Sequence, residues 1–254
     1  MRALVTFAVD PEFAAWRKFR KFEQTAIGDR AVYQTQIGRA SVDVMVTGMG
    51  PENARRAAET AMSVPHTFCI SSGFAGALRP AHKVGDILVA QAVEQIGKSK
   101  TIESAAGLVT RAHQDGAKCV DVFLTSERVV GTIKEKARLA PFGDAVDMES
   151  FAILSAARER NVPAVAIRVI SDGFDQDMPV NFSTAIDQKG RVMTGAIVRE
   201  IVRHPVVVPA LIRLGRESRA AAESLANFLE AYIEKASSSA HGWAPSEVLE
   251  VAAG

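Results

Sequence analysis

Acidic residues stand at the ends of several predicted strands in this sequence. Glu149 lies in the segment Asp-Met-Glu-Ser (147–150), at the start of a predicted helix, and Asp172 ends the segment Arg-Val-Ile-Ser-Asp (168–172). Glu12 comes just after the first predicted strand, and the turn Gly-Phe-Ala-Gly (73–76) follows another. Because ligands of α/β sheets bind beyond the carboxyl ends of the strands, these residues are candidates for one site.

Three acids placed in this way have the properties needed to break an N-glycosidic bond. The leaving base takes up a proton, the sugar develops positive charge, and a water is activated on the opposite face of the ring. Asp172, Glu149 and Glu12 can serve as the acid, the ribose-binding carboxylate and the base. An acid that protonates a purine N7 must keep its proton near neutral pH, which burial at the end of an apolar strand favours.

Strands and helices alternate along the chain, which is typical of an α/β protein. Apolar residues predict a strand at 2–9, and Asp10-Pro11 predicts the start of a helix whose apolar face contains Phe13, Trp16 and Phe19. Two alternating segments, 31–37 and 40–47, predict a hairpin. We therefore expect a single-domain three-layer α/β/α sandwich with a central mixed sheet. Further strands are expected at 67–72, 87–93, 122–125 and 164–170, helices at 51–62, 148–160 and from 193 with a break at His204-Pro205, and a long polar loop at 94–118.

Composition excludes several classes of protein. The chain has 254 residues, enough for one domain with a sizeable core, and its formal net charge of +1 predicts neither nucleic-acid nor anionic-membrane binding. Its most apolar late run, 205–214, is too short to span a membrane and contains Arg213. Cys69 and Cys119 cannot form a disulfide framework, and without a secretory signal we expect a cytoplasmic protein. The five histidines match no metal-ligand spacing, so we expect them on the surface or in loops, with no metal or cofactor.

Five segments, in order along the chain, resemble the signature motifs of the nucleoside phosphorylase/nucleosidase superfamily. The similarity is greatest to methylthioadenosine/S-adenosylhomocysteine nucleosidases and extends from Met1 to about Asp177. It implies a phosphorylase-like domain over residues 1–236, a flexible tail over 237–254, a homodimer and a nucleoside substrate. The segments are Val-Thr-Gly-Met-Gly (46–50), Ser-Gly-Phe-Ala-Gly-Ala-Leu (72–78), Val-Gly-Asp (84–86), Val-Asp-Met-Glu-Ser (146–150) and Ile-Arg-Val-Ile-Ser-Asp (167–172).

The resemblance implies a role for each matching residue. Glu12 would activate water, and Arg168 would help to fix both the water and Glu12. Ser171 would orient Asp172, which would protonate the purine, while Glu149 would bind the ribose hydroxyls. The remaining expected contacts are Met148 against the ribose, Phe74, Ala75 and Gly76 close to the sugar or base, and the backbone of Val129 and Val130 against the purine.

The sequence also departs from the nucleosidase pattern. Phe74 stands where the nucleosidases carry a small polar residue, so the nucleophile pocket is expected to be reshaped. Segment 94–118 is shorter and more polar than theirs, and the tail from Met193 is longer. In that tail, His204-Pro205 and the run 210–214 are similar to the hopanoid-associated branch of the superfamily, whose nucleoside carries a triterpenoid group at its 5′ carbon.

Three functions remain open from the sequence. A phosphorylase needs a site for a phosphate dianion, usually built from arginines and backbone N–H groups. Here the turn after the first strand contains Asp10 and Glu12 and no arginine, which favours hydrolysis of a 5′-substituted adenine nucleoside over phosphorolysis. A binding module without catalysis is the third possibility. Phe74 is compatible with such a module, but the presence of three candidate acids argues against it.

Overall fold

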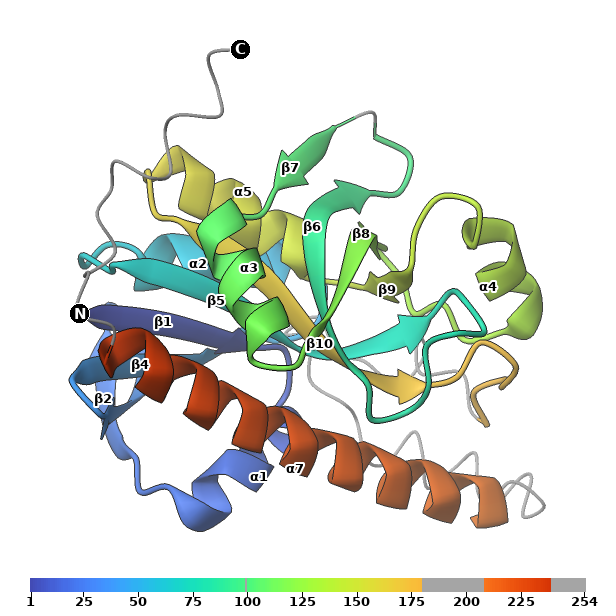
Figure 1. Ribbon diagram of the computed structural model, residues 1–254, viewed down its shortest axis with the longest axis horizontal. Coiled ribbons are helices and arrows are strands. Elements are labelled where there is room, and N and C mark those ends of the chain that lie inside the picture. The colour runs from blue at the N-terminus through green and yellow to red at the C-terminus, as the bar shows by residue number, and fades with distance from the viewer. Residues whose placement is uncertain (99, 180–207, 239–254) are drawn as a thin grey trace.

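A mixed β-sheet forms the centre of the molecule (Figure 1). The structure, a computed structural model, describes residues 1–98, 100–179 and 208–238. In sheet order the strands are β10-β6-β8-β9-β5-β1-β4-β3-β2, with β7 paired to β6. Their bounds are β1 Arg2–Phe7, β2 Glu23–Ile27, β3 Arg30–Ile37, β4 Ala40–Val46, β5 Phe68–Ala77, β6 Ile87–Gln95, β7 Thr101–Glu103, β8 Lys118–Thr125, β9 Ala145–Asp147 and β10 Ala164–Asp172.

Four neighbouring strands, β4, β1, β5 and β10, run parallel to one another. Their carboxyl ends therefore meet at the same edge of the sheet, and the segments that follow β1, β5 and β10 lie close together there. Part of the sheet also closes on itself, because β10 pairs with both β5 and β6, and β9 pairs with both β5 and β8. This curvature brings β9 and the residues after it to the edge formed by β5 and β10.

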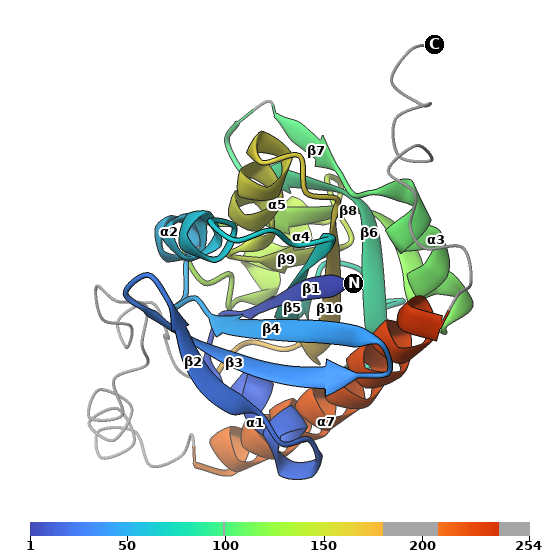
Figure 2. The same ribbon diagram turned by 90° about the vertical axis from the view of Figure 1, so that its left-hand side faces the viewer.

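Helices cover both faces of the sheet, as a three-layer α/β/α protein requires. The helices α2 (Pro51–Ala61) and α5 (Ser150–Glu159) pack in one apolar cluster, on the side opposite α1 (Asp10–Phe19) and α7 (Val208–Ser238) (Figure 2). The second cluster contains residues of α1, α7 and α3 (Ala106–Gln114). The expected fold class is confirmed. The short helix α4 (Ile133–Leu139) follows β8 and lies away from both layers (Figure 1).

The predicted aromatic face of α1 is only partly buried. Phe13 and Trp16 are fully buried, but Phe19 is 52 % exposed, so its expected place in the core is wrong. The reason is geometric, because each step of three residues falls short of a helical turn. Two such steps rotate Phe19 about 120° away from Phe13, toward solvent.

One further expectation is corrected. The segment 94–118 is not a long loop, since it contains the end of β6, β7 and α3, and the apolar side chains of α3 are buried. His66 lies in the loop between α2 and β5, where its ring is buried and its Nε2 lies 2.9 Å from Asp43 Oδ2. The late helix is present as α7, which ends at Ser238, two residues after the predicted domain boundary.

Some expectations concern the tail of the chain. The predicted helix start at 193, the break at His204-Pro205 and the end of the tail, 239–254, lie outside the described residues. Within the part of the chain that the structure describes, every helix is too short or too polar to cross a membrane.

Candidate active site

A cavity of about 940 Å³, its open mouth included, lies at the carboxyl ends of the parallel strands. Every site residue predicted from the sequence lines it except Arg168, which is buried beneath its wall. The lining residues are Ala8, Val9, Glu12, Met49, Phe74, Ala75, Gly76, Arg128, Val129, Val130, Val146, Asp147, Met148, Glu149, Ser171, Asp172, Met178, Leu214 and Ser218.

Glu12 is held by backbone N–H groups from two strand ends. It lies in the first turn of α1, and its Oε2 accepts hydrogen bonds from the N–H groups of Ala8 at 2.7 Å and Val9 at 3.1 Å. Its Oε1 accepts a hydrogen bond from the N–H of Phe74 at 2.7 Å. Burial raises the pKa of Glu12, although Arg168 and these N–H groups act in the opposite direction. A carboxylate with a raised pKa is a stronger base, which suits the activation of water.

Gly73 allows Glu12 and Arg168 to approach each other. Its φ of +134° is one that residues with side chains rarely adopt. A Cβ at this position would lie 2.6 Å from both Glu12 Oε1 and Arg168 Nη1. The expected turn at 73–76 is wrong, because these residues lie within β5 and pair with β10. Glycine is required at position 73 by both its backbone conformation and its surroundings.

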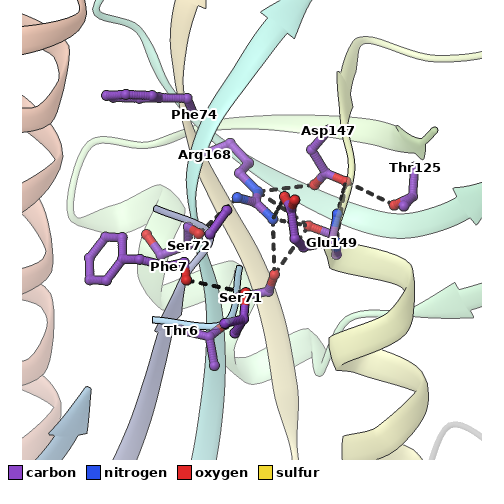
Figure 3. Close-up of polar contacts among 12 residues, drawn as sticks. Thr6, Phe7, Ser71, Ser72, Phe74, Thr125, Asp147, Glu149 and Arg168 are labelled. Atoms are coloured by element: carbon purple, nitrogen blue, oxygen red, sulfur yellow. Dashed lines mark hydrogen bonds and ion pairs between the residues drawn. The ribbon is translucent and has the colours of Figure 1, made fainter. Parts of the chain in front are cut away.

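Arg168 organises the polar groups below the cavity (Figure 3). It is fully buried on β10, and its Nε donates to Asp147 Oδ2 at 3.0 Å. Its Nη1 donates to the carbonyl of Ser72 at 2.7 Å, and its Nη2 donates to the hydroxyl of Ser150 at 3.1 Å. Burial acts to lower the pKa of Arg168, but Asp147, Glu149 and Glu12 together raise it. Arg168 forms buried ion pairs with Asp147 and Glu149, and its charge also acts on Glu12, which lies close to it on the other side of Gly73.

Asp147 is a structural residue of the site to which the sequence analysis assigned no role. Its side chain is fully buried, and its Oδ1 accepts hydrogen bonds from the hydroxyl of Thr125 at 2.9 Å and from the N–H groups of Glu149 and Ser150 at 3.2 Å. It thereby fixes the turn that begins α5 and links this turn to Arg168. Its place directly before Met148-Glu149 was the available signal.

Glu149 is the residue that precedes α5, and its carboxylate faces the cavity. Its Oε1 accepts a hydrogen bond from the N–H of Gly50 at 2.9 Å, and its Oε2 lies 3.7 Å from Arg168 Nη2. Burial raises the pKa of Glu149 to about 7, with Asp147 and Glu12 adding to the effect and Arg168 opposing it. Glu149 therefore changes charge near neutral pH.

Asp172 lies at the end of β10, and a polar group lies beside each of its carboxylate oxygens, although Oδ2 accepts no hydrogen bond from the described residues. The hydroxyl of Ser171 donates to Oδ1 at 2.9 Å, and the ammonium of Lys136 lies 2.6 Å from Oδ2. The sequence analysis expected burial in an apolar strand end. Burial is observed, but the surroundings include a buried cation that was not foreseen. A lysine in a short polar helix is usually solvent-exposed, so no local pattern pointed to Lys136.

Phe74 combines a backbone role with a packing role. Its N–H holds Glu12, while its side chain packs against the apolar cluster that contains residues of α1 and α7. In Figure 3 the ring points away from Arg168. The phenylalanine therefore replaces a small polar side chain without removing the N–H group that positions Glu12.

The rest of the cavity wall is largely apolar. Val129 and Val130 face it from the segment between β8 and α4, and α7 contributes Leu214 and Ser218. Arg128 is the one cationic side chain among the described lining residues, and its Nη1 lies 2.6 Å from Glu135 Oε1. The described residues contain no group of histidine, cysteine and acidic side chains arranged to hold a metal ion.

Known proteins resemble this chain in sequence and in fold. A family model described as the phosphorylase superfamily matches residues 2–203. The 5′-methylthioadenosine/S-adenosylhomocysteine nucleosidase of Staphylococcus aureus (strain bovine RF122 / ET3-1) is 25 % identical over 206 residues, which cover 72 % of this chain and 86 % of that protein. Two solved structures from Helicobacter pylori, the methylthioadenosine/S-adenosylhomocysteine nucleosidase and futalosine hydrolase, each align with a TM-score of 0.70 at 17 % identity, covering 92 % of this chain and 98 % of theirs.

Proposed function

Since the chain belongs to the phosphorylase superfamily, we propose that it hydrolyses the N-glycosidic bond of an adenine nucleoside and releases adenine. One observation carries the proposal: the carboxyl groups of Glu12, Glu149 and Asp172, from three separate elements, line a single cavity. Binding a nucleoside without chemistry does not need three buried acids. Since each buried acid costs free energy, their presence in one cavity is better explained by catalysis. The arrangement therefore favours an enzyme over a binding module.

Each acid has a distinct part in the proposed reaction. As the bond between C1′ and the base breaks, its electron pair moves to the base, and Asp172 transfers a proton to N7. Glu149 binds the ribose hydroxyls and stabilises the positive charge that develops on the sugar. Glu12 takes a proton from a water molecule whose oxygen bonds to C1′. The products are adenine and the free sugar.

The surroundings of Glu12 favour water over phosphate as the nucleophile. The N–H groups of Ala8, Val9 and Phe74 are the kind of donors that bind a phosphate dianion, but they already hold the Glu12 carboxylate. Arg168 is engaged by Asp147 and by serine oxygens. A phosphate dianion would therefore meet a carboxylate where it needs donors. Phosphorolysis remains the second candidate, because the family model that matches the chain is named for it.

The apolar wall of the cavity supports a nucleoside with a substituent at its 5′ carbon. Met178, Leu214 and Val130 form part of a wall that could contact a thioether or hydrocarbon group. The relative from Staphylococcus aureus is named for methylthioadenosine and S-adenosylhomocysteine. We propose these two nucleosides and a lipid-linked adenosine such as adenosylhopane as the substrates to compare. The sequence resemblance further implies a homodimer, which sedimentation or light scattering would test.

The proposal is tested by incubating the purified protein with methylthioadenosine, S-adenosylhomocysteine and adenosine and measuring free adenine by chromatography. We expect adenine release from at least one 5′-substituted nucleoside at a higher kcat/KM than from adenosine. The variant Asp172→Asn is the matched control, because asparagine has nearly the same shape but cannot supply the carboxyl proton. Tight binding of these nucleosides without release of adenine would support a binding module instead.

A further inference from the structure

Lys136 is a fully buried lysine whose ammonium group lies beside the proposed acid. It is on α4, its side chain has no exposed surface, and its Nζ lies 2.6 Å from Asp172 Oδ2. The same Nζ donates hydrogen bonds to the carbonyl oxygens of Gly173 at 2.6 Å and Gln176 at 3.1 Å. All three partners belong to the end of β10 or to the segment directly after it.

Other contacts fix α4 against that segment. The N–H of Ile133, in the first turn of α4, donates to Asp177 Oδ1 at 2.6 Å. The N–H of Met178 donates to the carbonyl of Gly131 at 2.7 Å. These two bonds hold the backbone just before Lys136 against Asp177 and Met178. The distance between the ammonium group and Asp172 is therefore set by backbone contacts as well as by the ion pair.

Burying the ammonium group of Lys136 costs free energy unless another group interacts with its charge. A fully buried ammonium group loses its hydration, and neutral carbonyl oxygens replace only part of what it loses. Asp172 is the carboxylate with which it forms an ion pair, and that side chain is 5 % exposed. If Lys136 served only to join α4 to the segment after β10, a neutral donor would do so at lower cost. The charge thus points to a role that depends on Asp172.

We propose that Lys136 is a positioning residue that stabilises the negative charge left on Asp172 as its proton passes to the leaving base. This inference rests on the proposed function. The ammonium group of Lys136 lies 2.6 Å from Oδ2 as an ion pair without a hydrogen bond, while the hydroxyl of Ser171 donates to Oδ1. Because charge on Asp172 grows as the bond breaks, a fixed cation at this point lowers the energy of the transition state more than that of bound substrate.

The role is tested with Lys136→Gln, which keeps a donor for the carbonyl oxygens but removes the charge. The exposed Lys134 on the same helix provides the matched control, Lys134→Met. Base release is measured for two nucleosides with the same sugar, one carrying adenine and one carrying 6-chloropurine. The less basic 6-chloropurine leaves with a smaller demand for protonation, so it depends less on Asp172.

For the adenine nucleoside we expect Lys136→Gln to lower kcat about 100-fold, the loss typical when one preorganised donor to a developing charge is removed. KM should change little, and the loss in kcat should be much smaller for the 6-chloropurine nucleoside. Lys134→Met should match the wild type. In the background of Asp172→Asn, adding Lys136→Gln should cause little further loss, because two residues that act through one another are not additive.

Equal losses of kcat for the two leaving bases, or a wild-type rate in Lys136→Gln, would overturn this inference alone. Loss of folding in Lys136→Gln, seen as a missing thermal transition, would assign Lys136 to structure and also overturn it. Absence of base release by the wild-type protein would contradict the proposed function itself and remove the basis of the inference. The wild-type measurement therefore comes first and separates the two failures.

Discussion

The raised pKa of Glu149 predicts how activity depends on pH. The proposed reaction needs Glu149 as a carboxylate, because only the charged form stabilises a cationic sugar. Burial raises its pKa from 4.5 to about 7, so it binds a proton roughly 300-fold more tightly than an ordinary glutamate. Activity should therefore decline as the pH falls through 7, where Glu149 becomes protonated.

The size of the decline follows from the fraction of ionised Glu149. At pH 5 about one hundredth of a group with a pKa of 7 is ionised, so kcat/KM should fall about 100-fold between pH 8 and pH 5. The pKa of Glu12 is also raised, so protonation of Glu12 adds to the decline. The assay is the initial rate of adenine release at substrate concentrations well below KM, in buffers of constant ionic strength from pH 5 to 9.

Stability should change with pH in the opposite direction to activity. A carboxyl group whose pKa is raised by folding stabilises the protein below its unfolded pKa, and this contribution is lost as the pH rises through 7. Glu149→Gln should therefore be more stable than the wild type at pH 8, by up to about 3 kcal/mol, and the difference should vanish near pH 4.5. A wild-type kcat/KM that stays constant from pH 8 to 5.5 would refute the role of Glu149. If Glu149→Gln has a lower Tm than the wild type at pH 8, burial is not the cause of the raised pKa of Glu149.

Three other substitutions test separate parts of the site and fold. Asp172→Asn should lower kcat for adenine release by more than tenfold, about 1.4 kcal/mol of barrier, and should fold cooperatively with a lower Tm, because buried Lys136 loses its ion-pair partner; a smaller loss of kcat would remove Asp172 from the acid role. Gly73→Ala should lower both Tm and kcat, because its methyl group would lie 2.6 Å from Glu12 Oε1 and the backbone would be strained; wild-type values of both would contradict this packing. Asp43→Ala should destabilise the protein by about 1–3 kcal/mol, since it leaves buried donors unpaired. Hydrogen bonds and charge from His66 and Arg2 outweigh burial and lower the pKa of Asp43, so this stabilisation should be present near neutral pH and lost in acid, and equal urea midpoints for variant and wild type would exclude it.

The family and the positions of the acids were predictable because both depend on short local segments. The segment from Arg168 to Asp172 ends β10, which is parallel to β5, so its end is predictable at this edge of the sheet. Asp147 ends β9, which pairs antiparallel with β5 and parallel with β8. The superfamily expected from these motifs is confirmed by the family model. The closing of part of the sheet was not predictable in the same way. β10 pairs with both β5 and β6, and the apolar residues of β10 do not indicate which strands it will pair with.

The charged residues below and beside the cavity could not be assigned from local sequence. Lys136 is buried because α4 packs against the segment after β10, and Arg168 pairs with Asp147 and Glu149 because β9 and the turn after it lie beside β10 in the fold. The segment 94–118 was predicted wrongly because β7 is only three residues long and α3 is polar on its outer face. In each case a contact between distant segments decides which residues are buried.

The central claim, hydrolysis with water as the nucleophile, is tested most directly by identifying the sugar product across a phosphate titration. The purified protein is given a saturating 5′-substituted adenine nucleoside, with phosphate varied from none to well above cellular levels, and the sugar is analysed by mass spectrometry. The account predicts a free sugar at every phosphate concentration and a rate of adenine release that does not depend on phosphate. A sugar 1-phosphate product, or a rate that rises in proportion to phosphate, would contradict it.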